Sequence, residues 1–135
     1  MWFPRINVLH ENCCDGRMPI QSFRDLEAWQ LAMTFVSRVY VLTRSFPREE
    51  LYGLAAQLRR AAVGIPSNVS EGHQQPTKAF AHYLTIALGS LAEAETQLEL
   101  AKQLRFAPAD DIAPILATAA RLRQVLHGLR RSLRT

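Results

Sequence analysis

A heptad repeat of apolar residues near the middle of the chain constrains the fold more than any other feature. Its members alternate at spacings of four and three residues without a break: Phe80, Leu84, Ala87, Leu91, Ala94, Leu98 and Ala101. This spacing places them all on one face of an α-helix and does not match the alternating faces of a strand. It predicts a long helix, from just after Pro76 and Thr77 to about Arg105, that must bury this face against other helices.

The segment from Arg24 to Ser45 has two adjacent helical rows of apolar residues. One row contains Leu26, Trp29, Met33, Val36 and Tyr40, and the other contains Ala32, Phe35, Val39 and Leu42. Two rows make a wide apolar face, so we expect this helix to contact neighbours on two sides. Ser22 is the expected cap, and Pro47 sets the end because the residue before a proline is disfavoured in a helix.

The next predicted helix starts at Pro47, a favoured first-turn residue, and runs to about Glu71, with Gly72 as its stop. Its apolar row contains Leu51, Leu54, Leu58, Ala61 and Ile65. Asn68 falls where the next member of this row should be. Pro66 lies inside the helix and should kink or break it around residues 64–66.

A last helix is predicted from about Ala109–Asp111 onward, following Pro108. Its apolar row contains Ile112, Ile115, Ala119, Leu122, Leu126, Leu129 and Leu133. Pro114 is tolerated if it stays in the first turn. All connections are short and no segment alternates like a strand, so the sequence predicts an all-α, up-down-up-down antiparallel four-helix bundle.

Residues 1–20 differ from the rest of the chain, because they show no sustained period and are followed by Met18-Pro19-Ile20. We interpret them as a loose extension, or Met18 as the true start, with one bundle domain over 21–135. Deleting residues 1–17 should leave folding intact. The two cysteines are the neighbours Cys13 and Cys14, so no disulfide framework or metal-binding cysteine spacing exists.

No uncharged apolar run approaches the ~18 residues that a membrane span needs, and the N-terminal segment lacks the apolar core of a signal peptide. We therefore expect a cytoplasmic protein without a membrane partner. Catalytic patterns are also missing: no Glu-x-x-His pair, no His-Glu-x-x-His and no P-loop or dinucleotide glycine motif occurs. The sequence predicts a protein that is not an enzyme and that uses neither cofactor nor metal.

Most of the excess positive charge lies in the last predicted helix. Arg123, His127, Arg130 and Arg134 are spaced four, three and four residues apart, and Arg121 and Arg131 flank them. Such a stripe could contact phosphates, because guanidinium groups bind two oxygens at once. It could equally be a solvated face whose cations suit the negative end of the helix. Aromatic residues do not interleave with these arginines, so any nucleic-acid contact should be to the backbone and sensitive to salt.

A second group of polar residues lies in the segment from Pro47 to Gly72: Gln57, Arg60, Asn68 and Glu71. A polar side chain on a packed face costs stability unless it has a partner, so it often sets register or association state. These residues therefore predict a second packed surface, formed when subunits associate. Gln57 and Arg60 could also be ordinary surface residues, and Arg59 and Arg60 could add to phosphate contacts.

Three ordered motifs in this sequence resemble a known family. They are Phe23-Arg24-Asp25-Leu26-Glu27-Ala28-Trp29-Gln30, the stretch from Phe46 to Gly72 containing Leu51-Tyr52-Gly53-Leu54 and Ile65-Pro66-Ser67-Asn68, and Ile86-Ala87-Leu88-Gly89-Ser90-Leu91. They resemble the small four-helix-bundle proteins encoded by intervening sequences of bacterial large-subunit ribosomal RNA genes. The chain is also similar to the accessory protein of diversity-generating retroelements.

The resemblance implies a homopentameric ring of bundles, with RNA or DNA and a reverse transcriptase or another protein as partners. By position, Gln57, Arg60, Asn68 and Glu71 correspond to the polar motif of the family. The first functional hypothesis is a non-enzymatic oligomeric scaffold that binds nucleic acid, most readily RNA, through Arg121, Arg123, Arg130, Arg131 and Arg134. The alternative is a protein–protein interaction module with no nucleic-acid role.

Overall fold

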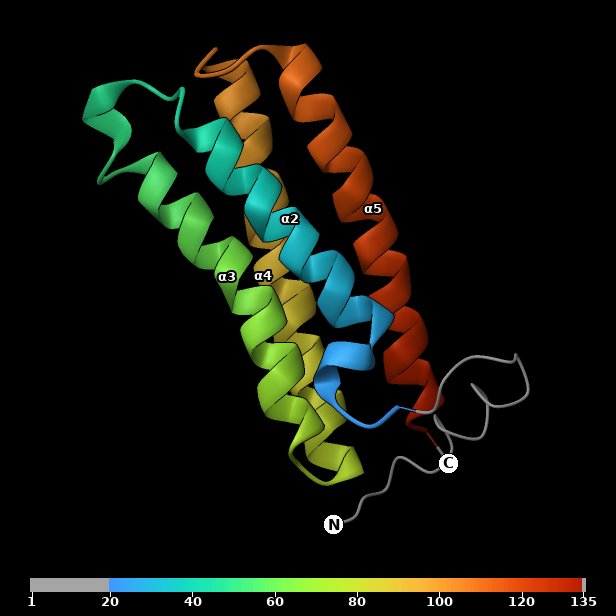
Figure 1. The fold of residues 1–135 in the computed structure, drawn as a ribbon. Helices are drawn as coiled ribbons and strands as arrows, with labels where there is room; N and C mark the ends of the chain where they lie inside the picture. Colours follow the sequence, from blue (N-terminus) through green and yellow to red (C-terminus); the bar gives the residue numbers. More distant parts are fainter. Residues whose placement is uncertain (1–19, 135) are drawn as a thin grey trace.

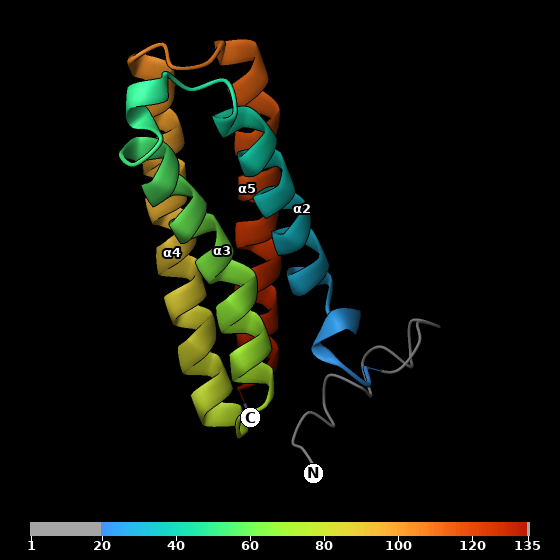
Figure 2. The same cartoon turned by 60° about the vertical axis from the view of Figure 1, so that its left-hand side comes forward.

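The computed structural model describes residues 20–134, and within them it contains four long helices and no strand (Figure 1). The helices are α2 (Glu27–Thr43), α3 (Leu54–His73), α4 (Thr77–Gln103) and α5 (Ala109–Ser132), with 3-10 turns η1 (Phe23–Asp25) and η2 (Arg48–Glu50). Successive helices run in opposite directions, as Figures 1 and 2 show. The expected all-α bundle is therefore confirmed.

The four helices form a closed arrangement. Each helix packs against the next one along the chain, and α5 also packs against α2. The heptad row of α4 lies entirely in the core between them, and each of its members is almost inaccessible to solvent. Facing side chains include Phe35 from α2, Ile65 from α3 and Leu122 from α5. Burial of apolar surface by all four helices thus holds the bundle together.

The first helix differs from its prediction at its start and on one of its faces. Leu26 has an extended backbone (φ −75°, ψ 130°) and separates η1 from α2, so Ser22 caps η1 and not a helix reaching to Ser45. Only one of the two apolar rows is packed throughout. From the other row, Met33 and Tyr40 are exposed, because no second neighbour within the subunit covers that side.

The helix α3 begins at Leu54 and not at Pro47, because η2 and a turn intervene. The expected apolar row is also displaced: Leu51 is exposed, and the fully buried row consists of Ala55, Leu58, Ala62, Ile65 and Val69. Of the predicted kink or break at Pro66, the break is wrong, since α3 continues through this residue to His73. Proline removes one backbone hydrogen bond but its fixed φ is helical, and the buried residues on both sides of Pro66 hold the helix continuous.

The turn between α3 and α4 requires a glycine for its packing. Gly72 does not stop α3, which continues to His73; instead it lies buried against side chains of α4. A Cβ at this position would lie 2.6 Å from Cβ of Tyr83 and 2.9 Å from a ring carbon of Phe80. The glycine therefore permits the close approach of the two helices.

The last two helices also deviate slightly from expectation. The helix α4 ends at Gln103, and Arg105 adopts a left-handed backbone conformation (φ 60°) in the turn that follows. Pro114 is the sixth residue of α5, beyond the first turn, and the helix nevertheless remains continuous. The predicted extension over residues 1–17 and the proposed start at Met18 lie outside the described residues. Within residues 20–134, none of the helices has the length and apolarity to cross a membrane.

Candidate nucleic-acid interface

The predicted arginine stripe lies along α5, beside the buried row that contains Ile112, Leu122 and Leu126. The helical spacing puts the arginines at the edge of the packed face, where long side chains can reach the neighbouring helices or the solvent. These two environments divide the stripe into two halves with different partners.

In the middle of α5, the two predicted contact residues form ion pairs with other helices. The Nη2 atom of Arg121 lies 2.5 Å from Oε2 of Glu27 on α2. Arg123 pairs in the same way with Glu95 on α4. These pairs connect α5 to both of its neighbours and place a carboxylate beside each guanidinium group. The structure therefore gives Arg121 and Arg123 acidic partners within the subunit.

At the carboxyl end of α5 the basic side chains have no such acidic partners among residues 20–134. Arg130 donates hydrogen bonds to Oγ1 of Thr85 on α4 (3.1 Å), and its Nη2 atom lies 3.1 Å from Nδ1 of His127. Arg131 and Arg134 are exposed. We call His127, Arg130, Arg131 and Arg134 the basic end. It is the part of the predicted stripe whose charge is not already balanced.

The titration of His127 reflects this environment. Burial lowers the pKa of the imidazole below its ordinary value, and the positive charges of Arg130, Arg131 and Arg123 lower this pKa further. The neutral ring can accept a hydrogen bond from Arg130 through Nδ1, which the charged ring could not do. His127 is therefore predominantly neutral near neutral pH.

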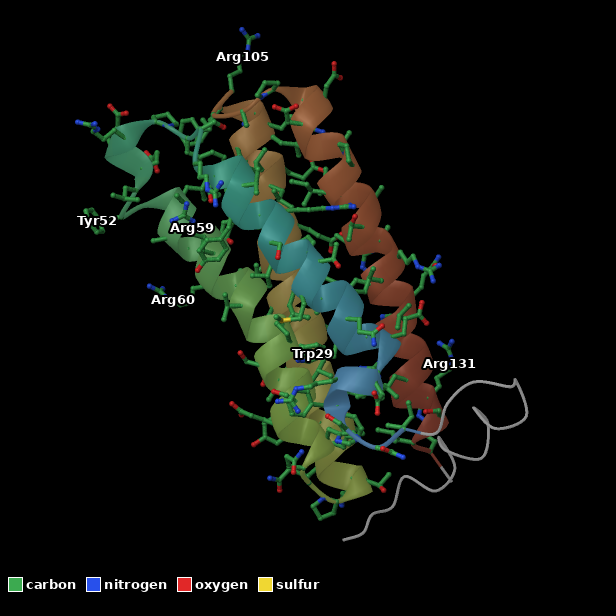
Figure 3. The ribbon with its side chains drawn as sticks, in the orientation of Figure 1. Trp29, Tyr52, Arg59, Arg60, Arg105 and Arg131 are labelled. Carbon is green, nitrogen blue, oxygen red and sulfur yellow. The ribbon has the colours of Figure 1, made fainter. Side chains whose placement is uncertain are left out.

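The arginines of α3 do not join the basic end. Arg59 is half-buried: its Nε atom donates to Oγ1 of Thr43 at 2.8 Å, and its guanidinium lies over the ring of Tyr40, 4.7 Å from the centroid. Arg60 is exposed. Figure 3 shows both on the α3 side of the bundle, well separated from Arg131. A single ligand surface on one subunit cannot use both groups.

The polar residues of α3 occupy the outside of the subunit. Gln57, Arg60 and Glu71 are exposed, whereas Asn68 is half-buried and donates from Nδ2 to the carbonyl oxygen of Gly64 at 2.7 Å. Asn68 thus lies beside the packed row and not within it, because the buried row is displaced by one residue to Val69. The amide has a partner within its own helix.

A shallow apolar hollow lies next to these polar residues and was not anticipated from the sequence. It has a volume of about 530 Å³ and is lined by Tyr40, Leu51, Tyr52, Ala56, Arg59, Arg60 and Val63. Tyr52 is 92% exposed and Leu51 is 46% exposed. The sequence predicts Leu51 to be buried, and for this reason it does not predict this surface. The signal that could have revealed it is the neighbouring turn-forming Gly53, which ends the helical pattern there.

Within residues 20–134, no three histidine, cysteine, aspartate or glutamate residues come together in a way that could hold a metal ion. His73, His82 and His127 lie on different helices or at different heights of the bundle, and His73 packs edge-on against Phe80.

Comparison with known proteins identifies the family. A model of the 23S rRNA-intervening sequence protein family matches residues 24–128. The chain belongs to this family. The matched region of this intervening-sequence family protein includes all of α2, α3 and α4 and most of α5. The family resemblance seen in the three sequence motifs is thereby confirmed.

A solved structure has the same fold as this chain. It is a protein of unknown function from the S23 ribosomal protein family of Bacteroides thetaiotaomicron, with a TM-score of 0.71 and 22% sequence identity. The similarity covers 77% of this chain and 95% of the other. At this level of identity the likeness supports the fold alone. No curated protein matches the sequence.

Proposed function

We propose that this protein is a non-enzymatic, cytoplasmic, self-assembling scaffold that binds RNA through the basic end of α5. The observation that carries the proposal is the contrast in pairing along this helix. Arg131 and Arg134 are exposed and have no acidic partner among the described residues, and Arg130 is held in place by uncharged groups. Arginines that are held in position and have no acidic partner are suited to bind the phosphates of a nucleic-acid backbone.

The expected mode of binding follows from the composition of the basic end. Guanidinium groups with no aromatic side chain beside them contact phosphates and sugars more than bases. We therefore expect little sequence preference. The logarithm of the affinity should fall with the logarithm of salt concentration with a slope of about −2 to −3, since about three phosphates would be neutralised.

The test compares two triple variants of equal charge. One carries Arg130→Glu, Arg131→Glu and Arg134→Glu. The matched control changes three exposed arginines at the other end of the bundle to glutamate: Arg44, Arg48 and Arg105. We expect the first variant to lose RNA binding at low salt and the control to retain most of it. Equal losses would mean only net charge matters, and no binding by the unaltered protein would end the RNA proposal.

Self-assembly is the second part of the proposal. The resemblance implies a homopentamer, and the support from this subunit is the apolar hollow with the polar face of α3 beside it. Exposed tyrosine, leucine and arginine side chains gathered around a hollow have the composition of an interface core. Light scattering should give a mass near five subunits. Tyr52→Ser with Leu51→Ser should reduce this mass, whereas the control Tyr83→Phe, at a half-buried tyrosine of α4 that does not line the hollow, should not.

The same hollow supports the alternative function, a protein–protein interaction module without a nucleic-acid role. A reverse transcriptase or another protein could then occupy it. The two proposals differ in a measurable way. An oligomer that stays intact and binds no RNA at low salt would favour the alternative, and the arginines of α5 would then serve only solubility and helix pairing.

A further inference from the structure

His127 and its neighbours form the best defined polar cluster at the basic end. Three side chains from two helices meet there: Thr85 on α4, and His127 and Arg130 on α5. Arg130 bridges the other two, with 3.1 Å to Oγ1 of Thr85 and 3.1 Å to Nδ1 of His127. The guanidinium is thereby held between α4 and α5, so less side-chain entropy is lost when it binds an anion.

The charged groups that act on the pKa of His127 are all arginines of α5. They are Arg123, Arg130 and Arg131, and each lowers this pKa. Two acidic groups of the packed helices, Glu95 on α4 and Glu27 on α2, pair with Arg123 and Arg121. Within residues 20–134, no carboxylate pairs with Arg130, Arg131 or His127. An anion entering here would therefore meet uncompensated positive charge.

We propose that His127, Arg130 and Thr85 form a phosphate-binding site where α4 and α5 pack together, and that binding of an RNA phosphate there is accompanied by protonation of His127. This inference rests on the proposed RNA-binding function and deepens it. The guanidinium supplies the fixed positive charge, and the imidazole supplies a second charge only when the anion is present. The Thr85 hydroxyl donates to the carbonyl oxygen of Ala81 at 3.1 Å and accepts from Arg130, so its part is to hold the guanidinium in position.

The proton balance gives the sign of the effect. In the free protein the neighbouring arginines favour neutral imidazole. Protonation of Nδ1 ends its hydrogen bond from Arg130. A phosphate that accepts from both Nδ1 and the guanidinium replaces this bond and offsets the repulsion, so the pKa of His127 rises in the complex. A ligand that raises a pKa binds with uptake of a proton, and its affinity increases as the pH falls. The increase approaches about tenfold per pH unit between the free and bound pKa values.

The experiment measures RNA affinity at constant ionic strength from about pH 8 to about pH 5.5, the range in which a histidine titrates. The unaltered protein should bind at least about fivefold more tightly at the acidic end. In His127→Gln, which keeps an acceptor for Arg130 but cannot titrate, the affinity should change less than about twofold across the range. The control His82→Gln removes an exposed histidine from α4 and should retain the pH dependence.

A second measurement does not depend on RNA binding. Proton NMR should show the His127 pKa rising when inorganic pyrophosphate is added, and this rise should shrink in Thr85→Val and disappear in Arg130→Gln. A pKa that does not move, or a pH profile that persists in His127→Gln, would overturn the site. If pyrophosphate raises the pKa but RNA does not bind, the phosphate site stands and the proposed function fails. If RNA binds through Arg131 and Arg134 with a flat profile, the function stands and this inference fails.

Discussion

The two halves of α5 carry the same kind of side chain and have different electrostatic environments. Arg121 and Arg123, in the middle of the helix, meet Glu27 and Glu95 from the flanking helices. Arg131 and Arg134, at its carboxyl end, meet no acidic group of residues 20–134. An arginine stripe is therefore not a functional unit by itself. What separates the paired arginines from the others here is which acidic residues the other helices bring beside them.

The largest expected effect separates the two halves by RNA affinity. Replacing Arg131 and Arg134 with glutamine should weaken RNA binding about 10- to 100-fold, because two charge-assisted contacts are lost. Replacing Arg121 and Arg123 with glutamine should weaken it less than about threefold, since these charges are already balanced. A filter-binding or fluorescence anisotropy titration at low salt measures both. Equal losses in the two double variants would show that pairing does not divide the helix.

A smaller effect should result from removing the acidic partners. Changing Glu27 and Glu95 to glutamine frees Arg121 and Arg123 and raises the net positive charge of the α5 face. RNA affinity should then increase by about three- to tenfold at low salt, and the salt dependence should steepen. Unchanged affinity would mean that the middle of α5 lies outside the RNA footprint. The control Glu49→Gln with Asp110→Gln alters charge by the same amount away from these pairs.

The two halves should also differ in their contribution to folding. Arg123→Gln should lower the free energy of unfolding by at most about 1 kcal/mol, because a partly exposed ion pair between α5 and α4 is lost. Arg131→Gln should leave this free energy nearly unchanged. Urea unfolding followed by circular dichroism measures both values. A larger loss in Arg131→Gln would assign that residue a structural partner.

The smallest expected effect concerns the pH dependence of stability. Folding lowers the pKa of His127 through burial and the neighbouring arginines, so the native state binds this proton less tightly than the unfolded chain does. The contribution of His127 is therefore neutral above about pH 6.5 and becomes destabilising as the pH falls through the lowered pKa. His127→Gln should show a shallower decline in melting temperature over this range. An identical decline would contradict the coupling.

Helix positions were predictable where a strict apolar period extends over many residues. The row from Phe80 to Ala101 is buried throughout, because a heptad of that length leaves only one face to pack. In α2 two rows were equally apolar, and periodicity alone could not decide which of them faces the core. In α3 a shift of one residue moved Asn68 out of the packed row and left Leu51 exposed. The apolar period therefore does not predict the buried face of a helix that offers more than one possible apolar row.

The candidate site was predictable in its location and not in its internal division. The spacing of Arg123, His127 and Arg130 placed them on one stripe of a helix, as found. Which of them are neutralised depends on Glu27 and Glu95, which are distant in the sequence and come into contact only through the tertiary fold. The hydrogen bond from Arg130 to Thr85 likewise forms only because α4 and α5 pack together. Local pattern cannot supply such contacts, because they depend on helix rotation and relative height.

The even number of helices has a practical consequence for anyone handling the protein. Because the chain crosses the bundle four times, residues 20 and 134 lie at the same end, and this end also carries Arg130, Arg131 and Arg134 (Figure 1). A fusion partner or an acidic peptide tag joined to the carboxyl terminus would lie directly beside these arginines. Internal attachment in the turn at Arg105, on the opposite end, would keep that surface accessible.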